Sequence, residues 1–444
     1  MIRAQRPVKG CELETTHSMR SQNLQWKFHP QRDVLLAEAH ARPSTPVVAP
    51  HLASRIATMS GEGGVDADRA HMAALCRKIG TPEPGPDARW CVLDGGNWRL
   101  RWERHTEIST WTVFCESPPA PDFMFENTAL DLIPQDWLAA LPGEILCAAH
   151  AVLSVTPPDR LPFAESETIA ARVANGAIDV FSDFRPGPDS FTRFVMVQAD
   201  PNPITAGRVL QQLFEIETYR LLALLAFPLA NATSVTLARF EAEAAASAIQ
   251  VADEGGVEAD RSLLSRLAAL AGEAEAMVGA TTYRFAAARA YEGLVLERIG
   301  QLREQSIDGR PTIADFMERR LAPAMRTCLA VAQRQHDVIE RIARTTQMLN
   351  TRVEVASEAI NVGLLASMDR RAQEQFRLQQ TVEGLSVAAI SYYALGLIHF
   401  AMEGLAETFG HFNAKAATGI AAPIVVLGVW MILRHLRRTI AKGE

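Results

Sequence analysis

Polar side chains interrupt an apolar stretch near the C-terminus, and they are the first candidates for chemistry. Residues 384–402 read GLSVAAISYYALGLIHFAM without any formal charge. Five polar side chains lie within this stretch, and two carboxylates follow it. The candidates among them are Ser391, Tyr392, His399, Glu403 and Glu407. Ionisable groups inside membranes usually serve function, and rings of carboxylates concentrate cations at channel mouths. The pattern allows a pathway for a divalent cation; the alternative is helix packing through the small residues on the same face.

A second polar group occurs near the N-terminus. Residues 28–43 read FHPQRDVLLAEAHARP and contain His29, His40 and Arg42. These side chains could form a small polar site, or they could cap and anchor a turn before Pro43, since proline disfavours helix in the residue before it. No third metal ligand lies within sequence range, so the site's metal, if any, stays unknown.

Familiar catalytic patterns are missing from the sequence. It contains no P-loop, G-x-S-x-G, H-E-x-x-H or dinucleotide-binding fingerprint. The six cysteines have no C-x-x-C spacing, which favours a reducing compartment and argues against a thiolate zinc site. The net charge of −7 gives no reason to expect nucleic acid binding. We therefore predict no enzyme activity and no cofactor.

Two membrane-spanning helices are the elements that would position the C-terminal polar groups. Residues 384–402 and 416–433 are free of formal charge, and roughly 20 apolar residues are enough to cross a bilayer. Basic residues flank the outer ends of this hairpin: Arg370, Arg371, Arg377, Arg434, Arg437, Arg438 and Lys442. The connecting loop carries only Lys415 as a basic residue. The positive-inside rule then predicts a multi-pass protein with both termini in the cytoplasm and a basic cytoplasmic tail at 434–444.

The N-terminal half has the pattern of a sheet. Residues 1–27 carry no apolar signal segment, and we predict a disordered lead-in. Residues 90–102 place two strand-like runs around a Gly-containing turn, which indicates a hairpin. In its second strand Trp98, Leu100 and Trp102 alternate with charged residues, which predicts one buried face and one wet face. Further strands at 106–114, 144–155, 177–184 and 191–198 complete an α+β cytoplasmic domain at 28–200.

From residue 201 to 383 the sequence predicts a helical bundle and stalk. Helices are expected at 205–227, ending before Pro228, then at 235–251, 259–277, 279–305 and 313–321. An apolar stripe then continues at helical spacing through Val338, Ile342, Leu349, Val353, Ala356, Ile360 and Leu364. A continuous helix over 324–402 would span ~120 Å, and it must pack in a bundle, a coiled coil or a symmetric oligomer to be stable. The fold class is therefore an α+β cytoplasmic domain, a long-helix bundle or stalk, and a C-terminal two-helix transmembrane hairpin at 384–433.

Several runs resemble a known family. They are residues 28–32 (FHPQR), 38–43 (EAHARP), 101–107 (RWERHTE), 215–220 (EIETYR) and 378–386 (LQQTVEGLS). They are similar to the bacterial family of uncharacterised membrane-anchored proteins labelled domain of unknown function 3422. The resemblance covers nearly the whole chain after residue 27. It implies a location in the bacterial inner membrane and no particular activity.

A weaker resemblance concerns architecture alone. CorA-type magnesium channels also combine a cytoplasmic α+β domain, a long stalk helix leading into the first span, and a second span that ends in basic residues. Their Gly-Met-Asn signature after the first span is absent here, where residues 399–404 read HFAMEG. Fold analogy does not carry function. The sequence therefore leaves two main hypotheses, an oligomeric membrane-anchored scaffold or a CorA-like homo-oligomeric cation pathway, with a membrane-tethered enzyme as a third.

Overall fold

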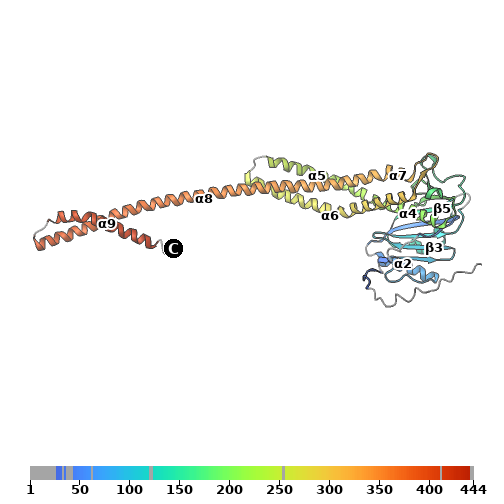
Figure 1. Ribbon diagram of the computed structural model, residues 1–444, viewed down its shortest axis with the longest axis horizontal. Coiled ribbons are helices and arrows are strands. Elements are labelled where there is room, and N and C mark those ends of the chain that lie inside the picture. The colour runs from blue at the N-terminus through green and yellow to red at the C-terminus, as the bar shows by residue number, and fades with distance from the viewer. Residues whose placement is uncertain are drawn as a thin grey trace, which may run out of the picture. The chain divides into compact units, whose positions relative to one another are not determined.

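We analysed a computed structural model of the chain, which describes residues 27–32, 35–36, 44–61, 64–119, 124–252, 256–410 and 413–440 (Figure 1). The chain divides into two compact units. Residues 1–241 and 273–339 form what we call the sheet unit, and residues 242–272 and 340–444 form the stalk unit. The predicted lead-in up to residue 26 lies outside the described residues.

A nine-stranded sheet organises the sheet unit, in the order β2-β3-β4-β1-β5-β8-β7-β6-β9. The strands are β1 His51–Met59, β2 Trp90–Asp94, β3 Trp98–Arg104, β4 Ser109–Cys115, β5 Glu144–Ser154, β6 Ile169–Val173, β7 Ile178–Ser182, β8 Thr192–Gln198 and β9 Gln305–Ser306. Neighbouring strands are antiparallel except β5 and β8, which are parallel. The mostly antiparallel sheet that the sequence predicted is present.

Three of these strands were missed by the sequence analysis: β1, β6 and the two-residue β9. Strand β1 lies between β4 and β5 at the middle of the sheet, and eight of its nine residues are buried. A strand that is covered on both faces loses the alternation of apolar and polar residues by which strands are recognised. Its sequence, HLASRIATM, also mixes polar and apolar residues without a period of two. The central strand was therefore the hardest one to see.

Helices cover both faces of the sheet (Figure 1). On one face, α2 (Gly64–Ile79) and α3 (Gln135–Ala139) pack onto a core that includes Trp98, Trp102 and Trp111. On the other face, α4 (Pro203–Leu224) packs against β5, and Leu222 contacts Ala57 and Cys147. The prediction of a wet face on β3 is therefore wrong: the helical layer that includes α4 closes it, and Arg101 and Glu103 are each only 3% exposed.

A close approach fixes the start of α4. Asn202 caps the helix by accepting hydrogen bonds from the backbone N–H of Ile204 and Thr205. One turn into the helix, a Cβ atom on Gly207 would lie 1.9 Å from the carbonyl oxygen of Thr45. The segment before β1 therefore crosses α4 where only glycine leaves room for its backbone.

Except for α7, the remaining helices are longer than the sequence predicted. They are α5 Ala226–Ala252, α6 Gly256–Leu302, α7 Ile313–Arg320, α8 Ala322–Phe409 and α9 Ala414–Ile440. Pro228 does not start a loop, because α5 begins two residues earlier and proline is tolerated in the first turn of a helix. Gly279 does not divide α6 either. The continuous helix expected from residue 324 to 402 is present as part of α8.

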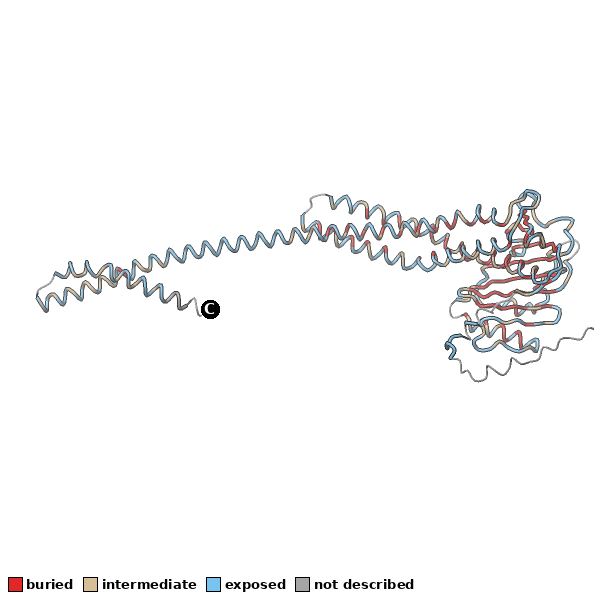
Figure 2. The backbone as a smooth tube through the Cα atoms, in the orientation of Figure 1, coloured by how far each residue is buried: buried red, intermediate tan, exposed pale blue. Residues whose placement is uncertain are grey.

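In the stalk unit, α8 is covered at first and then uncovered (Figure 2). Ile342 and Leu349 are buried, and Arg352 binds Asp260 at the start of α6 and donates to the carbonyl of Val251 in α5. Between residues 351 and 390 no residue is buried. Ile360 and Leu364, which continue the predicted stripe, are exposed in the single chain.

In the part of the chain that the structure describes, three helical segments are long and apolar enough to cross a membrane. They are Pro203–Ala252, a stretch within Ile313–Glu407, and Lys415–His435. The sequence analysis expected only the last two regions. In Pro203–Ala252 the apolar window is 33% buried inside the protein, against 6% and 0% in the other two. Burial of α4 on the sheet accounts for much of its apolar character, since Val209, Leu213 and Ile216 belong to the core.

Candidate functional site

The N-terminal polar group is described only in part. His29 is exposed, and its Nδ1 atom accepts a hydrogen bond from the backbone N–H of Gln31. His40 and Arg42 lie outside the described residues. Within the described ranges, no three His, Cys, Asp or Glu side chains come together in a way that could hold a metal ion.

The C-terminal polar residues separate into two groups in the helical hairpin of α8 and α9. Ser391 is 3% exposed, and its hydroxyl has no hydrogen-bond partner among the described residues. His399 contacts the Thr418 hydroxyl on α9 at 3.1 Å through Nδ1. Val387, one turn before Ser391, shares an apolar groove with residues of α9, so this face of α8 points into the hairpin. Tyr392, Glu403 and Glu407 are exposed instead. The structure does not bring these five residues together into one site.

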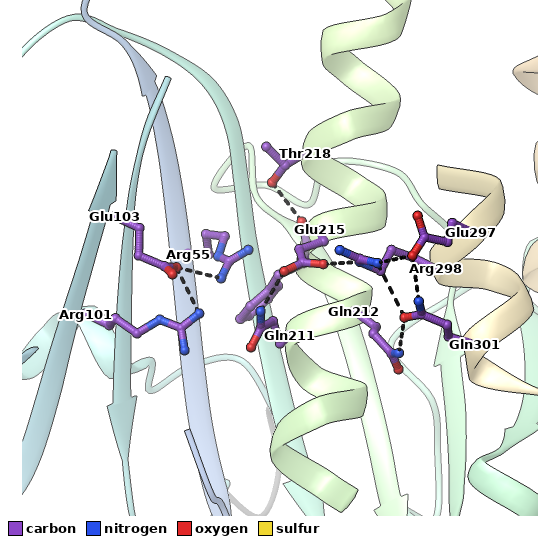
Figure 3. A network of polar contacts seen from close by, with 11 residues as sticks. Arg55, Arg101, Glu103, Gln211, Gln212, Glu215, Thr218, Glu297, Arg298 and Gln301 are labelled. Carbon is purple, nitrogen blue, oxygen red and sulfur yellow. Dashed lines mark hydrogen bonds and ion pairs between the residues drawn. The ribbon is translucent and has the colours of Figure 1, made fainter. Parts of the chain in front are cut away.

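A denser polar network lies on the face of the sheet that was expected to be wet (Figure 3). Glu103 on β3 accepts a hydrogen bond from Arg101 at 2.8 Å and lies 3.9 Å from a guanidinium nitrogen of Arg55 on β1. Arg55 also donates to the Thr112 hydroxyl on β4 and lies over the ring of Phe214 from α4. Two guanidinium groups thus share one carboxylate in the interior of the protein.

Burial and charge act against each other in this network. Burial alone would raise the pKa of Glu103, but Arg101 and Arg55 outweigh it and hold the pKa below its ordinary value. Burial lowers the pKa of Arg55, although Glu103 opposes the effect. Glu103 is therefore ionised at neutral pH, and both arginines depend on it for charge compensation.

Helices α4 and α6 carry a second set of polar contacts beside the first (Figure 3). Glu215 on α4 pairs with Arg298 on α6 and accepts a hydrogen bond from Gln211 at 2.7 Å. Gln301 accepts from Gln212 at 3.0 Å and from Arg298 at 3.4 Å. Side chains from α4 and α6 thus join the two helices (Figure 3). Most of these polar groups are paired with one another, which suits a rigid framework rather than a reacting centre, although the buried side-chain oxygen of Gln211 has no partner among the described residues.

On the opposite face, Asp68 holds the end of β3. It is fully buried and accepts hydrogen bonds from the hydroxyls of Ser60 and Ser109 at 2.8 and 2.5 Å. Arg104 lies 3.3 Å from the same carboxylate and also donates to Ser60 and to the carbonyl of Gly61. This cluster closes the loop before α2 onto the sheet.

A serine, a histidine and an aspartate that are distant in sequence lie close together on the same face of the sheet. The Ser54 hydroxyl is 2.7 Å from Nδ1 of His150, whose Nε2 is 3.7 Å from Asp189. Ser54 is fully buried, so a substrate has no access to its oxygen. Burial lowers the pKa of His150 to about 4 despite the nearby Asp189, which makes it a poor base. The arrangement has the residue types of a hydrolase triad but not the exposure.

The sheet and helices also enclose a cavity of about 490 Å³ at the end of the β3–β4 hairpin. Arg89, His105 and Thr106 line it from the sheet side. Tyr219 on α4 and Tyr291 on α6 line it from the helical side, and their rings stack with centroids 5.8 Å apart. His105, in the turn between β3 and β4, therefore forms part of the cavity wall.

Two of the runs that carry the family resemblance meet in this region. Residues 101–107 supply Arg101, Glu103, Arg104 and His105, while residues 215–220 supply Glu215 and Tyr219. The sequence analysis used both runs for recognition and assigned neither a role. Their density of charged and aromatic residues on a predicted strand and helix was the available signal.

Comparisons with known proteins give one positive result. No curated protein and no solved structure matches the chain, so the architectural resemblance to CorA-type channels gains no support. The family described as "Protein of unknown function (DUF3422)" matches residues 27–440. This match covers nearly the whole chain, and the protein therefore belongs to the DUF3422 family.

Proposed function

We propose that this protein is a membrane-anchored, homo-oligomeric scaffold that holds the sheet unit on the cytoplasmic side of the bacterial inner membrane. The supporting observation is the apolar surface of the α8–α9 hairpin. Leu397, Phe400 and Ile420 are each more than 70% exposed. Contiguous apolar surface of this kind is unfavourable in water and marks a binding or membrane surface. Lipid is the partner whose thickness fits two charge-free segments of this length.

Charged and aromatic residues at the ends of the hairpin support the same orientation as the sequence. The guanidinium of Arg434 lies 4.8 Å from the ring centre of Trp430, a pair suited to the membrane interface. Most basic residues lie outside the two apolar segments, at 370–377 and 434–442, whereas the region between the segments has Glu403 and Glu407 at the end of α8 and only Lys415 as a basic residue. The proposal therefore places the turn in the periplasm.

The middle of α8 supports association of several copies. Residues 353–383 expose large apolar side chains, including Val355, Ile360, Leu365 and Phe376. A single uncovered helix gains no tertiary packing and is marginal in water. Copies of the same stretch, packed as a coiled coil or bundle, would bury these side chains. We include the homo-oligomer in the proposal for this reason.

Reporter fusions test the anchoring. Fusions at the N-terminus and after Glu444 should report cytoplasm, and a fusion within residues 404–415 should report periplasm. Termini on opposite sides of the membrane would remove one of the two spans. A periplasmic signal within residues 204–251 would show that α4 and α5 form a third crossing.

A cation pathway is the second candidate, and it rests on the exposure of Glu403 and Glu407 near the turn. Ser391 does not favour it, because its side chain faces into the hairpin of its own chain. Two helices cannot enclose a pore, so conduction requires a ring of copies. Vesicles containing the purified protein should then pass magnesium or another divalent cation faster than empty vesicles.

The variant with both Glu403→Gln and Glu407→Gln should lower that flux if the carboxylates concentrate cations. Glu374→Gln, which removes an exposed carboxylate from the middle of α8, is the matched control. Wild-type flux equal to that of empty vesicles would reject the pathway. The mass of the detergent-solubilised complex bears on both candidates, because a monomer would contradict the scaffold and the ring alike.

A further inference from the structure

The cavity beside the β3–β4 hairpin is lined by polar groups, some of which have no hydrogen-bond or ion-pair partner among the described residues. At about 490 Å³ it falls within the usual size of small-molecule sites, roughly 300–1,000 Å³. Leu222 and Leu294 give it apolar walls. The polar groups around it decide what kind of molecule could fit.

Both tyrosines that line this cavity carry a neutral O–H group. Tyr219 and Tyr291 line the cavity, and neither hydroxyl forms a hydrogen bond with a described residue. Burial, with the nearby Glu215, raises the pKa of Tyr219 to about 12. Burial, with Glu107, raises the pKa of Tyr291 to about 12 as well. Each phenol therefore keeps its proton at neutral pH and can donate it to a ligand oxygen.

The charge at the cavity is positive and partly uncompensated. Arg89, an exposed residue, lines the cavity and makes no ion pair with a described residue, whereas Arg104 is compensated by Asp68. The nearest acidic side chain on the hairpin, Glu107, is engaged by Arg284 at 2.9 Å and by the Tyr283 hydroxyl at 2.6 Å. The uncommitted groups thus include one cation and two phenol hydroxyls.

We propose that this cavity binds a small molecule bearing an oxyanion, a carboxylate or a phosphate group. The oxyanion accepts from the guanidinium of Arg89 and from the hydroxyls of Tyr219 and Tyr291, and an apolar or planar remainder packs between Leu222 and Leu294. Charged hydrogen bonds to guanidinium are the strongest available here, and oxyanions are the groups that match its geometry. A metal cation is disfavoured because no free carboxylate lines the cavity.

Binding of anions to the full chain in detergent tests the proposal. Isothermal titration with inorganic phosphate, adenosine monophosphate and benzoate should give saturable binding for at least one probe. Adenosine and benzyl alcohol, which lack the anionic group, should bind at least tenfold more weakly. The phosphate and carboxylate probes separate the two kinds of oxyanion.

Variants then locate the binding. Arg89→Ala should weaken it at least tenfold, and the pair Tyr219→Phe with Tyr291→Phe, which keeps both rings, should weaken it about as much. Arg160→Ala removes an exposed arginine at a separate cavity and should leave the affinity unchanged. Melting temperatures of all variants report whether the fold is retained.

Three results would overturn the inference. One is the absence of saturable binding for every anionic probe up to about 10 mM, several times the concentration at which a site with a millimolar Kd is half filled. Another is an equal loss in Arg89→Ala and Arg160→Ala, which would indicate nonspecific attraction. The third is unchanged affinity in the double phenylalanine variant. None of these results depends on whether the hairpin enters a membrane.

Discussion

The sheet unit and the α8–α9 hairpin differ in what they bury: the first buries charged side chains, and the second exposes apolar ones. In the sheet unit, Arg55, Arg101 and Glu103 are buried between the sheet and α4. In the hairpin, large apolar side chains such as Leu397 and Ile424 are exposed. Buried charges are costly unless they are paired, and exposed apolar surface is costly unless something covers it. The sheet unit pairs its buried charges within one chain, whereas the hairpin leaves its apolar surface uncovered within one chain.

This difference shows how the same sequence signal can mean two things. Alternating charges on β3 resemble a solvated sheet face, yet a helical layer covers them. An unbroken apolar run resembles a core helix, yet no part of the described chain buries it. The meaning of each pattern depends on what packs against it, and four experiments can break or sharpen the comparison.

Removing the central carboxylate of the network should have the largest effect. Glu103→Ala leaves the guanidiniums of Arg55 and Arg101 buried without their shared partner, and breaking a buried pair typically costs about 3–5 kcal/mol. Chemical denaturation followed by tryptophan fluorescence measures this, since Trp102 and Trp111 lie in the same sheet. Glu116→Ala, which removes an exposed carboxylate just after β4, is the control. Similar losses in both variants would mean that burial of the network has no energetic role.

A charge in the hairpin should be nearly as disruptive if lipid covers it. Ile424→Lys places an ammonium group in the middle of α9, at a cost of about 2.5–3.5 kcal/mol for insertion. The amount of protein in the membrane fraction after alkaline extraction should fall. Leu364→Lys, on the exposed middle of α8, should leave that amount unchanged. Full membrane retention of Ile424→Lys would argue that water, not lipid, surrounds this surface.

Replacing glycine by alanine should also distinguish the two regions, with a smaller change in stability. In Gly207→Ala the added methyl group meets the carbonyl of Thr45, and overpacking of this kind costs about 1–3 kcal/mol. A Cβ on Gly396 in the hairpin meets nothing within 4 Å. Gly396→Ala should therefore leave the melting temperature of a monomer unchanged. A large loss there, with a change in oligomer mass, would place a second copy of the chain against this face.

Mild acid should give the smallest loss of folding stability, and this loss should come from histidines of the sheet unit. Burial lowers the pKa of both His51 and His150 to about 4, from 6.5 in the unfolded chain. The unfolded state therefore takes up protons first, so the stability from each neutral histidine is complete above pH 6.5 and is lost as the pH falls toward 4. Between pH 7 and 5.5 the loss is about 1 kcal/mol per histidine.

Denaturation curves at several pH values measure this slope. The variant carrying His51→Asn and His150→Asn should show a flatter dependence than the wild type. An unchanged slope would mean that other groups control the acid response.

Much of the secondary structure could be predicted from the sequence, because its signals are local. The hairpin around residues 94–97 followed from its turn residues and the alternation on each side, and the long helix through Ile342 and Leu349 followed from apolar spacing. The errors occurred where local signals compete with packing. Pro228 suggested a break, but its place in the first turn of α5 makes it compatible with helix.

The candidate sites were predicted less well. Ser391, Tyr392, His399, Glu403 and Glu407 looked like one group because they are close in sequence, yet helical geometry turns Ser391 inward and Tyr392 outward. The network around Glu103 and the cavity beside Tyr219 went unrecognised as sites. Their members come from strands and helices more than 100 residues apart, and no single stretch reveals that they meet.

The sequence by itself determined the features that depend on neighbours along the chain: the sheet-rich N-terminal region, the succession of long helices, and the two charge-free segments near the C-terminus. Tertiary structure decided which faces are covered. It placed β1 at the centre of the sheet and closed a charged face with α4. It also left the middle of α8 bare within the chain. Burial is a property of contacts between distant segments, so the cost and use of each charged or apolar side chain emerge only when those segments come together.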